Sequence, residues 1–245
     1  MQPMHRRHVL RVGVAMRVSL VGWLLLLCGC ASPFATVDAP MAVVAVPAVR
    51  PGDTWIYLQR NPYNGLVERT VTDTVVASAK GMMIERRSDR PADPVHLETV
   101  TAPWREIAES EGPMRRTFDA PLARIALPIA PGQGWSEQAT VTDQNGVQFL
   151  WRTWGRALGW ESVKTPAGEF AALRVERRMT LGDYDYAWSD TEVVETYWYA
   201  PAVRRWVRHE YQYERFELMV APRAKRILTD RIVWELQAFR PAGDS

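Results

Sequence analysis

The segment 145–180, NGVQFLWRTWGRALGWESVKTPAGEFAALRVERRMT, contains the local signals that decide the fold. It opens on Asn145-Gly146, a dipeptide typical of tight β-hairpin turns. Pro166-Ala167-Gly168 marks a second reversal of the chain. Around these turns, Val, Phe, Trp, Thr and Leu alternate with polar residues, which is the pattern of β-strands. The segment therefore predicts antiparallel strands joined by tight turns.

The same pattern continues in both directions from this segment, and Asn64-Gly65 supplies another hairpin signal. Helical periodicity is scarce: only 103–111 and 119–126 are expected to form short helices, the second with Asp119 as its N-cap. We expect strands at 53–60, 66–77, 82–88, 94–101, 135–143, 146–157, 160–165, 169–180, 191–199, 204–213 and 227–239. The predicted fold is therefore all-β with minor α: a single curved antiparallel sheet, half-barrel or β-clam-like, with one or two short helices on its concave side.

The N-terminus carries a different signal. Residues 1–29 contain four arginines and no acidic residue, and an apolar run from Val18 to Leu27 follows them. This is the arrangement of a signal peptide, and the run is about half the ~20 residues that a membrane-spanning helix needs. Both cysteines of the chain lie directly after it, in Leu27-Cys28-Gly29-Cys30. That spacing fits neither a C-x-x-C redox motif nor a metal site.

Leu27-Cys28-Gly29-Cys30 resembles the bacterial lipobox. The resemblance implies that residues 1–29 are a cleaved signal peptide and that Cys30 is lipidated, so that the chain is anchored to a membrane. Ala31, rather than Asp, follows the cysteine, which by the enterobacterial sorting rule implies the outer membrane, facing the periplasm. An ordinary secretory signal with incidental cysteines is the alternative.

Together with the signal peptide at 1–29, this interpretation divides the chain into three regions. Residues 30–50 are rich in Ala, Val and Pro, and we expect them to be the lipid anchor and an extended tether, although an edge strand within them is an alternative. Residues 51–245 form the antiparallel β domain. PGDTW (51–55) and PGQGW (131–135) each precede an Asn-Gly turn, which indicates a possibly duplicated meander over 51–130 and 131–240.

Composition limits the classes of function. Without the four arginines of residues 1–29, the chain has 26 basic and 28 acidic residues, so a nucleic-acid partner is not expected. The sequence contains no G-x-S-x-G motif and no P-loop, and no cofactor or metal is expected. Acidic residues gather at Asp183, Asp185 and Asp190, where a hydrolase could use them, although acids between two strands more often form a solvated turn, which is the favoured interpretation.

Aromatic residues alternate with arginines in WRTWGRALGW (151–160) and ETYWYAPAVRRWVRHEYQY (195–213). Rings on both faces of one sheet cannot all fill one core, so either both faces are covered or one face is an apolar groove that binds a ligand. Arginines flank Trp154 on its strand face, where they would meet an anionic head group. The candidate ligand-binding residues are Trp151, Trp154, Trp198, Trp206, Arg152 and Arg156.

The C-terminal half carries a family resemblance. VKTPAGEFAALRVERR (163–178) and ETYWYAPAVRRWVR (195–208) resemble the C-terminal half of the uncharacterised TapB-like envelope proteins, except that Arg204 stands where that family usually has glycine. A lipid-anchored, helix-poor sheet is also similar, at the level of fold alone, to the half-barrels of the lipoprotein carriers LolA and LolB. Neither resemblance implies a catalytic residue.

Together these features predict a non-enzymatic lipoprotein of the bacterial cell envelope. We expect it to bind a hydrophobic or amphiphilic ligand, or a partner protein of the envelope, through an aromatic groove. A structural accessory subunit of a polysaccharide or lipid export assembly is the alternative.

Overall fold

The computed structural model of the chain describes residues 35–78, 81–182, 191–217 and 225–243. All of them belong to one unit, Pro33–Ser245. Cys30 and the acidic residues Asp183, Asp185 and Asp190 lie outside the described residues. Within the described ranges, no helix has the length and hydrophobicity that crossing a membrane would require.

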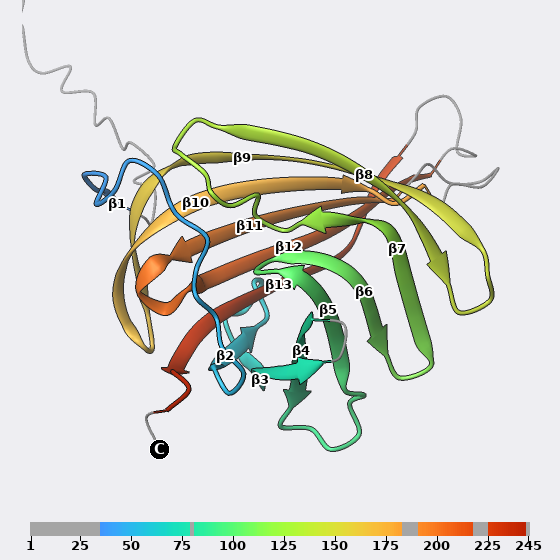
Figure 1. The fold of residues 1–245 in the computed structure, drawn as a ribbon, viewed down its shortest axis with the longest axis horizontal. Coiled ribbons are helices and arrows are strands. Elements are labelled where there is room, and N and C mark those ends of the chain that lie inside the picture. The colour runs from blue at the N-terminus through green and yellow to red at the C-terminus, as the bar shows by residue number, and fades with distance from the viewer. Residues whose placement is uncertain (1–34, 79–80, 183–190, 218–224, 244–245) are drawn as a thin grey trace, which may run out of the picture. The chain divides into compact units, whose positions relative to one another are not determined.

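Strands make up almost all of the described chain (Figure 1). They are β1 (Ala35–Thr36), β2 (Thr54–Arg60), β3 (Val67–Ser78), β4 (Gly81–Ser88), β5 (His96–Ala102), β6 (Arg105–Glu111), β7 (Met114–Ala123), β8 (Gly134–Asp143), β9 (Gln148–Thr165), β10 (Gly168–Thr180), β11 (Glu192–Ala200), β12 (Arg205–Glu217) and β13 (Lys225–Arg240). One short 3-10 helix, η1 (Pro201–Val203), joins β11 to β12. The all-β class is therefore confirmed.

The strands form one antiparallel sheet that closes on itself. Neighbours follow in the order β9-β10-β11-β12-β13-β2-β3-β4-β5-β6-β7-β8, and β8 pairs in turn with β9. The twelve strands β2–β13 thus complete a barrel-like ring, whereas a half-barrel was expected. In Figure 1 the strands β9–β13 curve side by side across one side, and β2–β7 stand opposite them. Closure pairs the edges that an open sheet would leave exposed.

The two predicted helices are wrong. Residues 103–111 and 119–126 instead fall largely in β6 and β7, which pair with each other and with β5 and β8. The sharp reversal before β6 is made by Trp104, whose φ of 65° is unusual for a residue with a side chain. Asp119 caps no helix; its Oδ1 accepts a hydrogen bond from the Thr140 backbone N–H on β8 at 2.7 Å. Pairing between strands distant in sequence has overridden the local helical preference.

The predicted turns are confirmed. Gly65 and Gly146 have φ of 72° and 81°, and Gly168, between β9 and β10, has φ of 132°. These conformations favour glycine because it lacks a Cβ atom. Arg204 at the end of η1 has φ of 61°, and its Nη1 donates to Asp53 Oδ2 at 3.0 Å. The arginine thus adopts at this position the left-handed conformation that glycine usually supplies.

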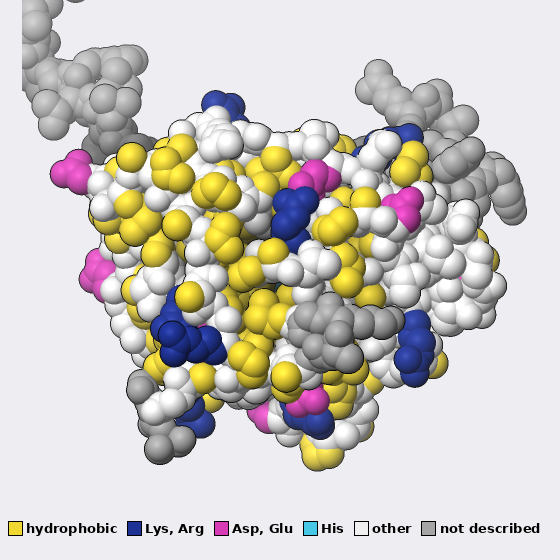
Figure 2. Space-filling view, in the orientation of Figure 1, with side chains coloured by type: hydrophobic (Ala, Val, Ile, Leu, Met, Phe, Trp, Pro, Cys, Tyr) yellow, Lys and Arg dark blue, Asp and Glu magenta, His cyan; other side chains and the backbone are white. Residues whose placement is uncertain are grey.

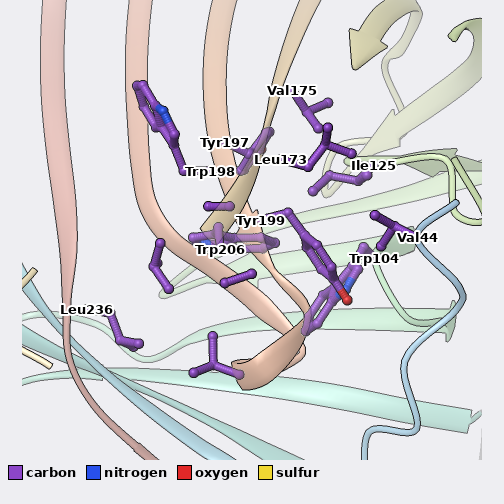
Figure 3. Packing of buried hydrophobic residues seen from close by; sticks show 14 of the residues in the cluster. Val44, Trp104, Ile125, Leu173, Val175, Tyr197, Trp198, Tyr199, Trp206 and Leu236 are labelled. Carbon is purple, nitrogen blue, oxygen red and sulfur yellow. The ribbon is translucent and has the colours of Figure 1, made fainter. Parts of the chain in front are cut away.

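An aromatic core fills the part of the ring near η1 (Figure 3). Trp104 and Trp206 lie with their ring centroids 5.2 Å apart, and Figure 3 shows Tyr199 beside them. Trp55 Nε1 donates to the Val203 carbonyl at 2.8 Å, which ties β2 to η1. We call this set the aromatic core; its most deeply buried aromatic residues are Trp55, Tyr57, Trp104, Tyr197, Tyr199 and Trp206.

Part of the expected tether contacts this core. Val44 is only 1% exposed and exchanges backbone hydrogen bonds with Ile129, at 2.8 and 3.0 Å. Figure 3 shows Val44 close to Trp104 and Ile125. By contrast, Val43 and Val46 on either side are exposed. The described part of the segment therefore attaches to the domain through the buried Val44, through the two-residue strand β1 paired with β9, and through the partly buried Val49 rather than through a full strand.

Candidate functional site

The interior of the ring contains a cavity of about 410 Å³. It lies beyond the aromatic core, toward the C-terminal ends of β6 and β10 and the first part of β13. Every ring strand except β8 contributes an inward-facing side chain to its lining. The volume falls within the range of small-molecule sites in proteins.

One wall of the cavity is apolar. Trp151 on β9 and Phe118 on β7 lie with their ring centroids 5.3 Å apart, and Met179 and Val193 are buried in the same cluster. The guanidinium of Arg116 lies 5.3 Å from the centroid of the Trp151 ring. The lining residues of this apolar wall are Phe118, Leu122, Trp151, Met179, Val193 and Ile232.

Buried ion pairs form the inner end of the cavity. Arg177 Nε on β10 donates to Glu195 Oε2 on β11 at 2.7 Å, and both side chains are 4% exposed. The Tyr197 hydroxyl donates to the other Glu195 oxygen at 2.7 Å. Because Tyr197 belongs to the aromatic core and Glu195 lines the cavity, this network separates the two.

The charge states in this network follow from burial and pairing. Burial alone would raise the pKa of Glu195, but the Arg177 guanidinium holds that pKa well below its usual range. Burial lowers the pKa of His209, so this imidazole is neutral at pH 7. Its ring stacks between Tyr197 and Trp234, with centroid distances of 4.3 and 4.8 Å. The network is therefore the ionised Arg177–Glu195 pair, to which the neutral Tyr197 hydroxyl and His209 Nε2 add hydrogen bonds at Glu195 Oε1.

Glu106 on β6 is the exception among the buried carboxyl groups of the cavity. It is 5% exposed, and its Oε1 atom has no hydrogen-bond partner. Its nearest cation is Arg124, whose Nη2 lies 3.4 Å from Oε2. Burial raises the pKa of Glu106, and together with the neighbouring Glu109 and Glu98 carboxylates it brings that pKa to about 8 against the lowering effect of Arg124. Without a ligand, Glu106 is therefore mostly protonated at neutral pH.

The structure does not bring the four predicted tryptophans into one groove. Trp151 lines the cavity wall, whereas Trp206 is buried in the aromatic core. Trp198 is buried on the opposite side of β11 from Tyr197, where its Nε1 donates to Glu161 Oε2 at 2.6 Å.

Trp154 lies on the outer face of β9 and is 41% exposed. The exposed Arg152 and Arg156 flank it on that face, and Arg178 lies opposite it on β10. The expectation of an anionic head group beside these arginines therefore concerns the outer surface, not the cavity. Figure 2 shows one face of the molecule, on which hydrophobic side chains are widespread and the charged ones form small separate groups.

Sequence reasoning missed the charged inner end of the cavity. The signal was present in the strand alternation, because Arg177 shares a strand face with Val175 and Met179, and Glu195 shares one with Val193 and Tyr197. Charges at inward positions of a strand indicate either buried ion pairs or a polar interior. Among the described residues, no cluster of three or more His, Cys, Asp or Glu side chains is arranged to hold a metal ion.

Comparisons with known proteins yield two distant structural likenesses. No family model matches the chain, so the resemblance to the TapB-like group stays a prediction. No curated protein matches it either. A candidate lipoprotein from Parabacteroides distasonis matches with a TM-score of 0.42 and 11% identity, over 80% of this chain and 100% of its own. A candidate exported protein with a YmcC-like fold from Bacteroides fragilis matches with a TM-score of 0.44 and 13% identity, over 80% and 99%. Likeness at this level carries no argument about function.

Proposed function

We propose that this chain is a non-enzymatic lipoprotein of the bacterial cell envelope that binds an amphiphilic small molecule in its interior cavity. The observation that carries the proposal is the cavity itself, with an apolar wall around Trp151 and a polar inner end formed by Glu106 and the ion pair of Arg177 with Glu195. An apolar chain would cover the wall, and a polar head would reach the polar end. The rigid ring would hold this cavity ready before the ligand arrives.

The anchor belongs to the same proposal and rests on the sequence LCGC at 27–30. We expect a palmitate analogue supplied to growing cells to label the wild-type chain and not Cys30→Ser, because the thiol of Cys30 is the acceptor of the lipid. Gel mobility and fractionation of the outer membrane complete the measurement. Equal labelling of both chains would exclude lipidation at Cys30.

Filling the cavity tests the binding function directly. Val71 on β3 is 4% exposed and points into the cavity, while the next residue, Thr72, lies on the other face of the strand. Val71→Trp places a large ring in the binding space, so it should weaken binding of the neutral apolar dye N-phenyl-1-naphthylamine by about tenfold or more. Thr72→Trp is the matched control and should bind like the wild type.

Dye fluorescence gives the affinity, and thermal unfolding shows whether each variant is folded. A folded Val71→Trp chain that binds the dye as tightly as the wild type would contradict the cavity as the binding site. The exposed Trp154 on the outer face would then become the candidate, and Trp154→Ala would test it.

A further inference from the structure

Glu106 has a buried acceptor atom that no protein group satisfies. Buried polar atoms in proteins almost always have a hydrogen-bond partner, because leaving one without a partner costs free energy. Oε1 of Glu106 has none, its side chain is more than nine-tenths buried, and it lines the cavity. The unsatisfied atom therefore marks the place where a bound molecule would complete the site.

The arginines around the cavity are each paired with a carboxylate through at least one nitrogen, although Nε of Arg69 and Nε of Arg124 have no hydrogen-bond partner. Each has a nitrogen within 2.8 Å of a carboxylate oxygen: Arg69 with Asp93, Arg86 with Asp73, Arg116 with Glu109, Arg124 with Glu98 and Arg177 with Glu195. An anionic head group could accept a hydrogen bond from one of these two N–H groups, but the positive charge of each arginine is already matched by a carboxylate. A head group that donates hydrogen bonds could donate one to Glu106 Oε1, which has no hydrogen-bond partner.

We infer that the head group bound at the inner end of the cavity is an amine in its cationic ammonium form, held by the Glu106 carboxylate. This inference rests on the proposed function and names the class of its ligand. An ammonium group offers N–H donors and a positive charge, and Oε1 of Glu106 offers an acceptor. The apolar part of the ligand would lie along Phe118, Trp151 and Met179.

The surrounding charges favour a cation over a neutral hydroxyl group. Glu98 on β5 and Glu109 on β6 both oppose ionisation of Glu106, whereas Arg124 and Arg177 favour it. A bound ammonium would supply the missing positive charge and stabilise the carboxylate. A neutral alcohol would provide a hydrogen bond without relieving this repulsion between carboxylates.

Proton release is the consequence that can be measured. Glu106 holds a proton in the empty cavity at neutral pH, because its pKa is about 8. Binding of an ammonium requires the carboxylate, so Glu106 must release that proton to solvent. Affinity for the amine should therefore rise with pH, by about tenfold per unit between about pH 6 and about pH 7.5.

The experiment is calorimetric titration of the folded chain with three decyl amphiphiles: decylammonium, decanoate and decyl glucoside, at several pH values. The wild type should prefer decylammonium and release about one proton per molecule bound. Glu106→Gln should lose the pH dependence and about tenfold of the affinity for decylammonium at pH 8. Glu106→Asp keeps the carboxylate and should retain the pH dependence.

Glu111→Gln is the matched control, because it also removes a carboxylate from the cavity lining but from a side chain that is 50% exposed. It should keep the pH dependence of the wild type. A preference for decanoate or decyl glucoside, or a pH dependence that survives in Glu106→Gln, would overturn the inference while leaving the proposed cavity function standing. If the neutral dye and all three amphiphiles fail to bind, the proposed function fails as well.

Discussion

Arg177→Met is expected to lower the free energy of unfolding by about 3–5 kcal/mol, because it leaves the buried Glu195 carboxylate without its guanidinium. Glu195 is 3% exposed, and the neutral His209 cannot replace the lost positive charge. Urea denaturation at pH 7 measures the change. Arg178→Met, one residue further along β10, is the control. Its side chain is 52% exposed and pairs with Glu192 at the surface, so the loss should stay within about 0.5 kcal/mol.

The double variant Arg177→Met/Glu195→Met separates the charge from the packing. Removing both partners leaves no uncompensated charge, so it should recover a large part of the stability that Arg177→Met loses. If Arg177→Met alone unfolds at the same urea concentration as the wild type, the ion pair is hydrated rather than buried, and the charged inner end of the cavity would need another description.

Trp206→Ala is expected to cost about 3–5 kcal/mol, which is a large share of the stability of an ordinary domain. The indole is 2% exposed and packs against Trp104 and Tyr197, with ring centroids 5.2 and 5.0 Å away. The buried Arg205 guanidinium also lies 4.2 Å from its ring centroid. Removing the ring would therefore leave a cavity and expose one side of a buried cation.

Trp154→Ala is the matched control for Trp206→Ala, because its indole lies on the outer face of β9 and is 41% exposed. Its loss should change the free energy of unfolding by less than about 1 kcal/mol. Urea denaturation followed by far-ultraviolet circular dichroism compares the two variants without relying on tryptophan fluorescence. Similar losses in both would contradict the assignment of one ring to the core and the other to the surface.

Local signals explain why much of the fold was predictable. Asn145-Gly146 and Pro166-Ala167-Gly168 fix turns by their own backbone preferences, and strand alternation fixes which residues share a face. Residues 103–111 and 119–126 were predicted incorrectly as helices because the strands there exist through pairing with β5 and β8, which a local pattern does not report. Closure of the ring depends in the same way on the register between β8 and β9.

The candidate site was less predictable than the fold. The aromatic stretches identified Trp151, but nothing in the sequence distinguished the cavity from the aromatic core around Trp206 or from the outer face that carries Trp154. That distinction depends on how far along the axis of the ring each inward-facing residue lies, and thus on the relative register of many strands. Glu106 was missed because it lies in a segment predicted as a helix.

The pairing of β2 with β13 has a consequence for how the chain reaches its folded state. Thr54 pairs with Arg240, so the first ring strand takes one of its neighbours from nearly the other end of the sequence. A chain that emerges N-terminus first would hold β2 with an unsatisfied edge until β13 had also emerged. Contacts of such long sequence separation also slow folding. We therefore expect C-terminal truncations within β13 to yield aggregating chains rather than smaller folded ones.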